Sequence, residues 1–458
     1  MDLQSRRVNQ HRPLRTLKRP QPRKGLYRAV ILCAILGLAI FTAGAVFTGR
    51  FSLTCFERSK SPPQVLILQE IDPSSVPEGE LTKDRLAKLI GPHSFRPDEL
   101  RSFRIRNEAG RELFVHTTLA PELQRWAMST IPRARANSVA LVVLNPANGD
   151  VLTMASYNAD HRPVNLNLQS SFPAASLFKI ITAAAAVEAR SLTSGSTLAY
   201  DGRKHTLYRQ NLKPDVRSGR HQVTLKESFA QSINIVFGKL GAFTLGPETL
   251  EEFARRFYFN QPIHFEMPVE PSRFSLPDED YFRLAEIASG FNRTTMLSPL
   301  HGAMLAAAIV NNGLIMEPTI VREVFDQDNN IYYRHQPVLM KRVISSQTVR
   351  EMRKMMQATI TKGTAHQSFK DVNYHPVLSR LEIGGKSGSI NDDLDRKVDW
   401  FVSFARRKGT TDRIALAVLV VHYRDKLGVR AYALVRDCMI QYFSPRIRPD
   451  KKFKTKRG

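Results

Sequence analysis

The sequence predicts an α+β domain built around one antiparallel sheet and preceded by a single membrane-spanning helix. Strand patterns occur at both ends of residues 113–445, with a helical middle between them. The terminal strands would meet in one sheet, with the helices packed on and beside it. The membrane helix rests on an uninterrupted apolar run over residues 29–49. With 458 residues, 42% of them hydrophobic, the chain can build one large or two ordinary cores.

The apolar run is long enough to cross a bilayer. Its 21 residues carry no charge and lie between Arg28 and Arg50. At about 1.5 Å per residue they span about 30 Å, the thickness of one hydrocarbon core. A cleavable signal peptide is the alternative, but its apolar region normally has about 7–15 residues. Nine Lys and Arg residues precede the run, so we expect a cytoplasmic N-terminus and an extracytoplasmic, periplasmic remainder anchored in the inner membrane.

The net charge of +25 first suggests a nucleic-acid binder. More than half of the excess, however, lies in two tails, residues 1–28 and 446–458. The chain shows no zinc-finger spacing, no RNA-binding signature and no phosphate-binding glycine loop. We therefore expect no nucleic-acid partner. The tails are either solvated or attracted to an anionic membrane or wall polymer.

The cysteine pattern indicates neither a metal site nor a disulfide framework. Cys33 lies in the apolar run, Cys55 follows it, and Cys438 is near the C-terminus. No pair has metal-ligand spacing, and the twelve histidines are scattered. We expect no metal and no cofactor. Cys55 and Cys438 remain able to pair if they meet outside the cell.

The remaining chain divides by composition. Residues 50–112 are rich in proline and charge and are expected to form a stalk or linker module, with a short polar helix at 81–90. Two apolar strands around the Asn145–Asp150 turn predict a hairpin. The other expected elements are helices from 176 and over 225–240, 247–257, 298–311, 346–361 and 428–442, and strands over 380–390, 398–407 and 413–423.

A serine and a lysine one helical turn apart are the first candidate catalytic pair. Ser176 begins the apolar helix and Lys179 lies three residues later, on the same face. A serine hydroxyl needs a base to become nucleophilic. A lysine can act as that base when burial or a second cation lowers its pKa. The helix start also places the Ser176 N–H where an oxyanion could be held. Taken alone, the pair is better explained by an N-cap and a snorkelling lysine.

Two further short motifs follow in order. Ser232 and Asn234 could relay a proton and orient a substrate amide, although caps explain them as well. Lys386-Ser387-Gly388-Ser389 follows two glycines on a strand. Glycines at a strand edge let a substrate backbone approach closely, so an extended peptide could add itself to that edge. Lys386 and the two hydroxyls would hold its terminal carboxylate, and the Ser389 N–H would complete an oxyanion hole. A turn with a surface lysine is the alternative.

A similar tripeptide, Lys362-Gly363-Thr364, resembles a scrambled version of the third motif. It follows an expected helix, and we interpret it as the C-terminal stop of that helix.

Order and context of the three motifs resemble the transpeptidase domain of penicillin-binding proteins. FPAASLFKIITAAAA is similar to the family's nucleophile segment, VALVVLNPANGDVLTMAS to its opening hairpin, and DWFVSFA to the strand after the third motif. The resemblance implies a five-stranded antiparallel sheet with an inserted all-helical subdomain. It also implies acylation of Ser176 by D-Ala-D-Ala stem peptides or β-lactams, with Lys179, Ser232, Asn234, Lys386 and Ser389 as catalytic residues and Asn234 and Lys386 to Ser389 as substrate-binding residues.

The sequence departs from the family pattern at two places. Ser387 stands where the family more often has threonine, and Ala174-Ala175 precedes the nucleophile in place of a glycine-containing turn. Neither change removes a catalytic group. Residues 50–112 are too few for a glycosyltransferase domain, so the resemblance implies a monofunctional enzyme of cell-wall synthesis that needs a separate glycan polymerase. The short stalk leaves a role in elongation, division or sporulation open.

Three other functions remain possible on the same fold. A D,D-carboxypeptidase would hydrolyse the acyl-enzyme. A serine β-lactamase would need a deacylating base, and none can be located. A non-catalytic sensor or scaffold would only bind β-lactams or wall peptides, and the presence of every catalytic group argues against it.

Overall fold

The computed structural model describes residues 81–91, 101–107, 109–160, 164–277 and 280–446. All of these residues lie in one compact unit. Within these ranges, no helix is both long and apolar enough to cross a bilayer. The predicted span at 29–49, the basic tail at 1–28 and residues 447–458 lie outside the described residues.

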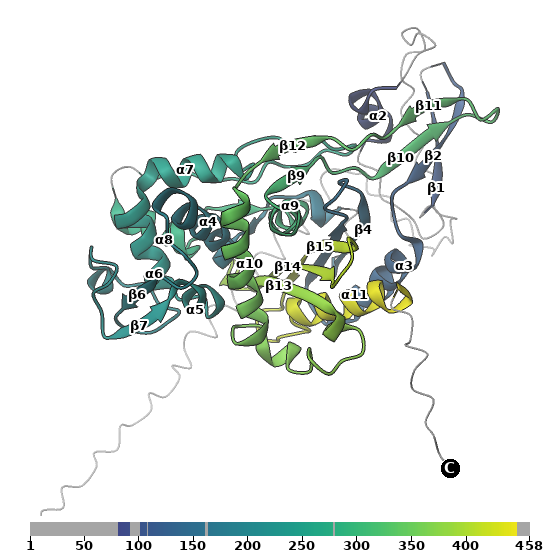
Figure 1. The fold of residues 1–458 in the computed structure, drawn as a ribbon. Coiled ribbons are helices and arrows are strands. Elements are labelled where there is room, and N and C mark those ends of the chain that lie inside the picture. The colour runs from purple at the N-terminus through teal and green to yellow at the C-terminus, as the bar shows by residue number, and fades with distance from the viewer. Residues whose placement is uncertain (1–80, 92–100, 108, 161–163, 278–279, 447–458) are drawn as a thin grey trace, which may run out of the picture. The chain divides into compact units, whose positions relative to one another are not determined.

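A five-stranded antiparallel sheet forms the centre of the domain (Figure 1). It unites strands from both ends of the domain, as the sequence predicted. Their order is β13-β14-β15-β3-β4, so β13 is an edge strand. The strands are β3 (Ser138–Leu144), β4 (Val151–Asn158), β13 (Leu381–Asn391), β14 (Lys397–Arg407) and β15 (Arg413–Val421).

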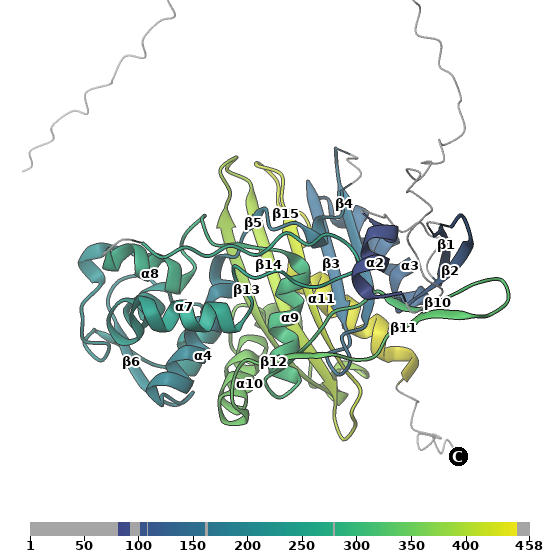
Figure 2. The same ribbon diagram turned by 90° about the horizontal axis from the view of Figure 1, so that it is seen from above.

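Helices cover both faces of this sheet (Figure 2). One face packs against α3 (Pro121–Thr130) and α11 (Ala431–Phe443), the other against α9 (Pro299–Val310). In β15, Leu416 and Val418 belong to the core cluster of α11, while Ala417 and Leu419 belong to that of α9. Alternate side chains point to opposite faces of a strand, so a strand covered on both faces must be apolar throughout. This is why β15 reads as a continuous apolar run.

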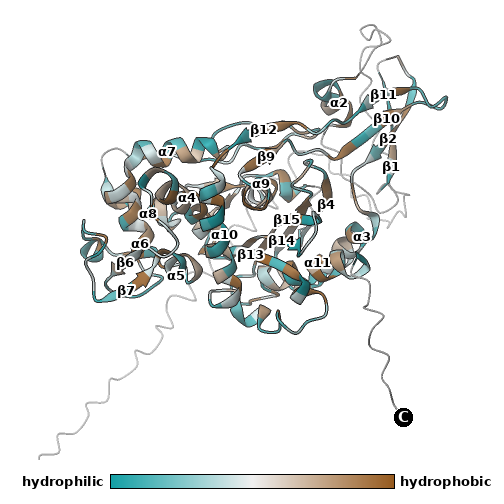
Figure 3. Ribbon diagram, in the orientation of Figure 1, coloured by the Kyte–Doolittle hydropathy of each residue, from teal (hydrophilic) through white to brown (hydrophobic). Residues whose placement is uncertain are grey.

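A mainly helical region lies beside the sheet (Figure 1). In the sequence it falls between β5 (Phe172–Pro173) and β13. The helices of this region are α4 (Lys179–Arg190), α5 (Leu225–Ala230), α6 (Asn234–Lys239), a π-helical turn at Leu240–Leu245, α7 (Gly246–Arg256), α8 (Tyr281–Ser289) and α10 (Ser346–Thr361). Brown, apolar residues gather in α4 and α9, while the outer helix α7 is paler and more polar (Figure 3).

The prediction that this subdomain is all-helical is wrong. A two-stranded ribbon, β6 (Thr197–Tyr200) and β7 (His221–Thr224), is part of it. The buried Lys239 Nζ donates hydrogen bonds to the carbonyls of Ala199, Asp215 and Ser218, at 2.6–3.1 Å. A lysine inside an apolar region needs such acceptors. The ribbon and its loop supply them.

Smaller sheets complete the fold. A four-stranded sheet has the order β1-β2-β10-β11, and it joins strands more than 200 residues apart in the chain. Its strands are β1 (Ser102–Arg106), β2 (Glu112–Thr117), β10 (Val321–Phe325) and β11 (Ile331–Arg334). Besides the β6–β7 ribbon, the described residues form two short antiparallel strand pairs. These pairs are β5 (Phe172–Pro173) with β8 (Met296–Leu297), and β9 (Leu314–Met316) with β12 (Leu339–Arg342).

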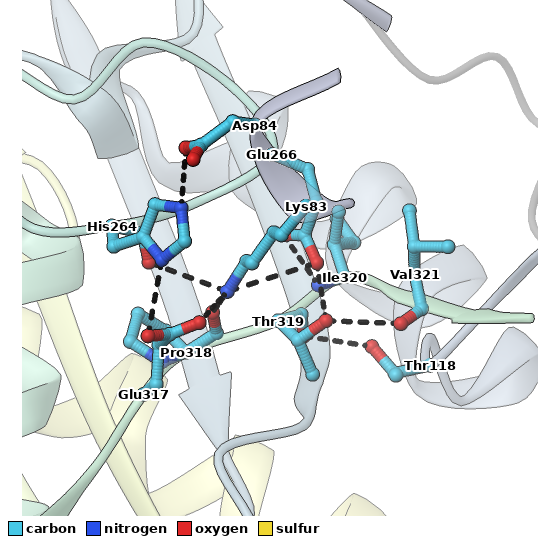
Figure 4. A network of polar contacts seen from close by, with 10 residues as sticks. All are labelled: Lys83, Asp84, Thr118, His264, Glu266, Glu317, Pro318, Thr319, Ile320 and Val321. Carbon is cyan, nitrogen blue, oxygen red and sulfur yellow. Dashed lines mark hydrogen bonds and ion pairs between the residues drawn. The ribbon is translucent and has the colours of Figure 1, made fainter. Parts of the chain in front are cut away.

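A buried lysine fixes helix α2 (Lys83–Ile90) to this part of the molecule (Figure 4). Lys83 Nζ donates to Glu317 Oε1 and to the Pro318 carbonyl, both at 2.7 Å. His264 bridges Glu317 Oε2 (3.1 Å from Nδ1) and Asp84 Oδ1 (2.8 Å from Nε2). Burial alone would lower the pKa of His264, but its hydrogen bonds to Glu317 and Asp84 raise it. The network therefore ties α2 to two segments far away in the sequence.

Asp399 should be a major contributor to stability, because it joins the sheet to α11. Its buried carboxylate accepts hydrogen bonds from Arg430 Nε and Nη2, at 2.7 and 2.9 Å, and from the Ala431 N–H at 3.1 Å. Asp399→Ala leaves these donors without their acceptor. It should lower the free energy of unfolding by about 3–5 kcal/mol in urea titrations.

The matched control is Asp395→Ala. Asp395 is exposed and lies 3.7 Å from Arg424, so its removal should cost less than about 1 kcal/mol. Equal losses in the two variants would contradict the role given to Asp399.

Candidate active site

The first motif lies at the junction between a short 3₁₀ turn and α4. Ser176 is the second residue of the turn Ala175–Phe178, and Lys179 begins α4. Ala175 has φ of 48°, a left-handed conformation that is costly for a residue with a side chain. Strain of this kind persists where the surroundings fix the backbone, and it is common at functional sites. Ser176 is half-buried, and its Oγ lies 2.8 Å from Lys179 Nζ.

The contacts of Lys179 explain how its amine can act on Ser176. Lys179 is fully buried. Besides Ser176 Oγ, its Nζ contacts Asn234 Oδ1 (2.8 Å) and the Ser289 carbonyl. These two oxygens only accept hydrogen bonds, so they take both N–H groups of a neutral amine. The lone pair is then left for the Ser176 hydroxyl.

Electrostatics favour this neutral amine. Burial, and after it the charge of Lys386, lowers the pKa of Lys179 well below its usual value. The ring of Phe237, 5.6 Å from Nζ, lines the same pocket. A lysine whose pKa is lowered in this way can accept the proton of a serine hydroxyl.

The second motif lies in a break between α5 and α6, where the sequence predicted one helix over 225–240. Ser232 adopts φ of 57° in this break, which turns its side chain toward Lys386. Asn234 begins α6 and is held on both sides: its N–H donates to the Lys204 carbonyl and its Nδ2 to the His205 carbonyl, both at 2.8 Å. The loop before the ribbon strand β7 thus orients the amide that contacts Lys179.

The third motif lies on the edge strand β13. Lys386 is fully buried, and its Nζ donates to Ser232 Oγ (2.9 Å) and to the Ser387 carbonyl (2.8 Å). Its Nζ lies 5.5 Å from the ring of Phe229. Burial lowers the pKa of Lys386 to about 7. The ammonium and neutral forms are therefore both accessible near neutral pH.

The two glycines before Lys386 do not have the predicted role of letting a substrate backbone approach. A Cβ at Gly384 or Gly385 would lie 2.5 Å from the ring of Phe404 or Phe401, so these two glycines make room for aromatic rings of the neighbouring strand. Gly388 is the one that faces the nucleophile turn, because a Cβ there would meet the Ala174 carbonyl at 3.2 Å. The exposed Ser389 follows it on the strand.

Thr364 is a site residue that the sequence interpretation missed. The predicted end of α10 is correct, since the helix stops at Thr361. The turn that follows also places Thr364 Oγ1 2.6 Å from Ser387 Oγ, and the Thr364 N–H donates to the Ala230 carbonyl at 3.1 Å. It therefore links the strand of the third motif to the end of α5. The tripeptide pattern was noticed in the sequence, but its position in space could not be read from it.

The structure also bears on the cysteines and on the question of a metal site. Cys438 is buried in α11 and free, and burial raises the pKa of its thiol. Cys55, with which the sequence left a pairing open, lies outside the described residues. Over those same residues, His, Cys, Asp and Glu side chains form no group that could hold a metal ion.

Comparison with known proteins agrees with this geometry. Residues 139–439 match the family model "Penicillin binding protein transpeptidase domain". The chain is 24% identical to the peptidoglycan D,D-transpeptidase PbpA of Mycobacterium tuberculosis over 70% of each chain. It is 27% identical to the stage V sporulation protein D of Bacillus subtilis, over 62% of this chain but only 45% of that protein.

Solved structures show the same fold. Penicillin-binding protein A of M. tuberculosis, in a ceftriaxone acyl-enzyme complex, aligns with a TM-score of 0.60 at 23% identity, over 73% of this chain and 80% of that one. The D,D-transpeptidase domain of a peptidoglycan glycosyltransferase from Eggerthella lenta aligns with a TM-score of 0.59 at 21% identity, over 72% and 83%. The predicted resemblance is confirmed: the chain belongs to the penicillin-binding protein transpeptidase domain family.

Proposed function

We propose that this chain is a peptidoglycan D,D-transpeptidase that cross-links stem peptides through an acyl-enzyme on Ser176. The observation that carries the proposal is the position of Lys179 Nζ, 2.8 Å from Ser176 Oγ and buried, with acceptors for both of its N–H groups. A serine so placed has its base in position before substrate arrives.

Acylation follows from this arrangement. Lys179 takes the proton of the Ser176 hydroxyl while Oγ attacks the carbonyl carbon of the penultimate D-Ala. The C–N bond to the terminal D-Ala then breaks. The leaving amine needs a proton, and the hydrogen bond from Lys386 Nζ to Ser232 Oγ provides a path for one. Free D-Ala leaves, and its place becomes available to a second amine.

Backbone donors and hydroxyls would hold the substrate. The N–H groups of Ser176 and Ser389 would stabilise the oxyanion. The charged Lys386, with the hydroxyls of Ser387 and Ser389, would bind the terminal carboxylate, and Asn234 would orient the substrate amide. Gly388 keeps the strand close to the nucleophile turn, which the two N–H groups require.

The second half-reaction separates the candidate functions. In transpeptidation an amine of a neighbouring stem attacks the acyl-enzyme, whereas in a D,D-carboxypeptidase water does. Relatives support transfer, since PbpA is a D,D-transpeptidase by name. A β-lactamase is less favoured, because it would need a deacylating base and the sequence identifies none. A sensor is less favoured, because every catalytic group is present, and the family match is to a transpeptidase domain.

The context of the reaction is part of the same proposal. We propose that residues 29–49 anchor the chain and that residues 50–112 form a stalk module, which α2 and β1 join to the rest of the domain. Residues 113–445 would act outside the cytoplasm with a separate glycan polymerase. The basic segments 1–28 and 446–458 would lie at the two ends of this arrangement. β-Lactams would acylate Ser176, as ceftriaxone does in the acyl-enzyme complex of the M. tuberculosis protein.

Labelled penicillin should bind covalently to the protein and map to Ser176. Ser176→Ala removes the attacking oxygen and should abolish labelling. Ser171→Ala, an exposed serine five residues earlier, should label like the wild type. Intact-mass measurement and peptide mapping provide the readout. Labelling that persists in Ser176→Ala would reject the assignment.

The rate of acylation by a D-Ala-D-Ala peptide should fall above about pH 7. Lys386 has a pKa of about 7, so its ammonium is present below that pH and is lost as the pH rises. The loss of the carboxylate-binding charge should lower kcat/KM by up to about tenfold per pH unit. Lys386→Arg keeps the charge, so its fall should move to more alkaline pH. Identical alkaline limbs in both proteins would exclude this role.

Donor peptide mixed with an acceptor amine should give cross-linked dimers. Transfer requires that the acceptor amine outcompete water at the acyl-enzyme. Mass spectrometry distinguishes dimers from the tetrapeptide that hydrolysis produces. Tetrapeptide without dimers, across a range of acceptor concentrations, would favour the carboxypeptidase.

A further inference from the structure

The loop between β6 and β7 holds the second motif at several points. The Asn234 N–H donates to the Lys204 carbonyl and its Nδ2 to the His205 carbonyl, both at 2.8 Å. Lys204 Nζ also donates to Gln231 Oε1, at 2.5 Å. β6 and β7 pack against α6 and α5, the two helices that flank the motif (Figure 1). The backbone of His205 is therefore fixed beside the catalytic groups.

The His205 side chain lies at the edge of this site. It is exposed, so a substrate can reach the ring. The ring forms a hydrogen bond with the Ser232 backbone. Because the Ser232 N–H already donates to the Phe229 carbonyl at 3.1 Å, the ring donates to the Ser232 carbonyl. A neutral imidazole that donates through one nitrogen keeps a lone pair on the other.

The surroundings of the ring favour its neutral form. Desolvation of the side that faces the protein lowers the pKa of His205, and the hydrogen bond with Ser232 opposes this effect. The charges of Lys179, Lys386 and Lys204 lower the pKa further. The pKa lies below the usual histidine value as a result, so near neutral pH the ring is an uncharged base.

The place of the acceptor amine follows from the proposed function, on which this inference rests. The nitrogen of the leaving D-Ala takes its proton through Ser232 Oγ, so it departs beside that hydroxyl. Transfer and its reversal follow the same path, so an amine that attacks the acyl-enzyme enters where the first amine left. His205 is bonded to the backbone of Ser232 and therefore flanks that position.

A stem amine arrives as an ammonium and must lose two protons to form an amide. The ammonium nitrogen cannot attack, because it has no lone pair. A further cation beside Lys179 and Lys386 is also unfavourable. A neutral base at the point of entry removes both obstacles, since it takes the first proton before attack.

We propose that His205 is the base that receives the acceptor amine. Its free ring nitrogen accepts a hydrogen bond from the incoming ammonium and takes one proton. The neutral amine attacks the carbonyl carbon of the acyl-enzyme, the C–N bond forms, and the C–Oγ bond to Ser176 breaks. The second amine proton passes to Ser176 Oγ through Lys179, and His205 returns its proton to solvent. Water carries no such charge on entry, so His205 favours transfer over hydrolysis.

The test measures how the acyl-enzyme of the full chain divides between an amine and water. The donor is L-Ala-γ-D-Glu-L-Lys-D-Ala-D-Ala with both amines acetylated. The acceptor is Nα-acetyl-L-lysine amide, which has no carboxylate for Lys386 to bind. Mass spectrometry gives the ratio of cross-linked adduct to tetrapeptide. The ratio depends only on the second half-reaction, so a change in the rate of acylation does not affect it.

The pH dependence of this ratio identifies the base. In the wild type the ratio should be level above the pKa of His205 and fall below it, because the protonated ring cannot take a proton. The fall should begin below the usual histidine value of about 6.5. In His205→Gln only the small neutral fraction of the acceptor reacts, so the ratio should rise about tenfold per pH unit throughout. At about pH 7 it should lie about a hundredfold below the wild-type ratio.

Two controls accompany this measurement. His221→Gln is matched, because His221 is an exposed histidine of the same ribbon whose ring packs against Tyr200, with centroids 5.0 Å apart. It should keep the wild-type ratio and its level region. Hydroxylamine is an acceptor that is already neutral near pH 7, so His205→Gln should use it nearly as well as the wild type does.

A wild-type ratio that rises about tenfold per pH unit, or a level region that persists in His205→Gln, would overturn the role of His205 and leave the proposed function standing. The wild-type profile alone can reject the role, even if the variant does not fold. A wild type that gives tetrapeptide without adduct, or that neither binds penicillin covalently nor releases D-Ala, would overturn the proposed function and the role of His205 with it.

Discussion

The burial of two lysine amines in one site is the constraint on which the rest of the structure depends. A buried ammonium is costly unless acceptors surround it, and two neighbouring ammoniums are costlier still. Lys179 and Lys386 meet this constraint in different ways. Lys179 is best satisfied as a neutral amine, whose N–H groups go to an amide oxygen and a carbonyl. Lys386 keeps a pKa of about 7 and donates to a hydroxyl and a carbonyl.

Supplying those acceptors shapes the surrounding backbone. The break between α5 and α6 brings the Ser232 hydroxyl to Lys386, and it needs a left-handed residue to do so. The end of α8 turns at Ser289 and offers its carbonyl to Lys179. Ala175 is left-handed as well, just before the nucleophile. These strained positions gather around the same two amines, while the five-stranded sheet and its two cores hold them in place.

Features encoded by neighbouring residues could be predicted from the sequence, and those made by distant residues could not. Local patterns made the sheet and the first catalytic pair predictable from the sequence. These patterns are the apolar runs of β3, β14 and β15 and the three-residue spacing of Ser176 and Lys179. The helix break at Ser232 was missed because apolar residues recur at helical spacing from Leu225 to Leu240, with no proline between them. The contact of Thr364 with Ser387 joins the turn after α10 to strand β13, which are brought together only by the tertiary structure. The two glycines before Lys386 were assigned to substrate, yet they accommodate Phe401 and Phe404 of the adjacent strand.

The central claim is that Lys179 is a neutral amine before substrate binds, and an NMR titration tests it most directly. Lysine labelled with ¹³C at Cε, assigned by loss of one signal in Lys179→Arg, reports the protonation of that side chain. The account predicts that Lys179 titrates well below the usual lysine pKa. A Lys179 signal that stays in its ammonium position up to pH 10 would contradict it.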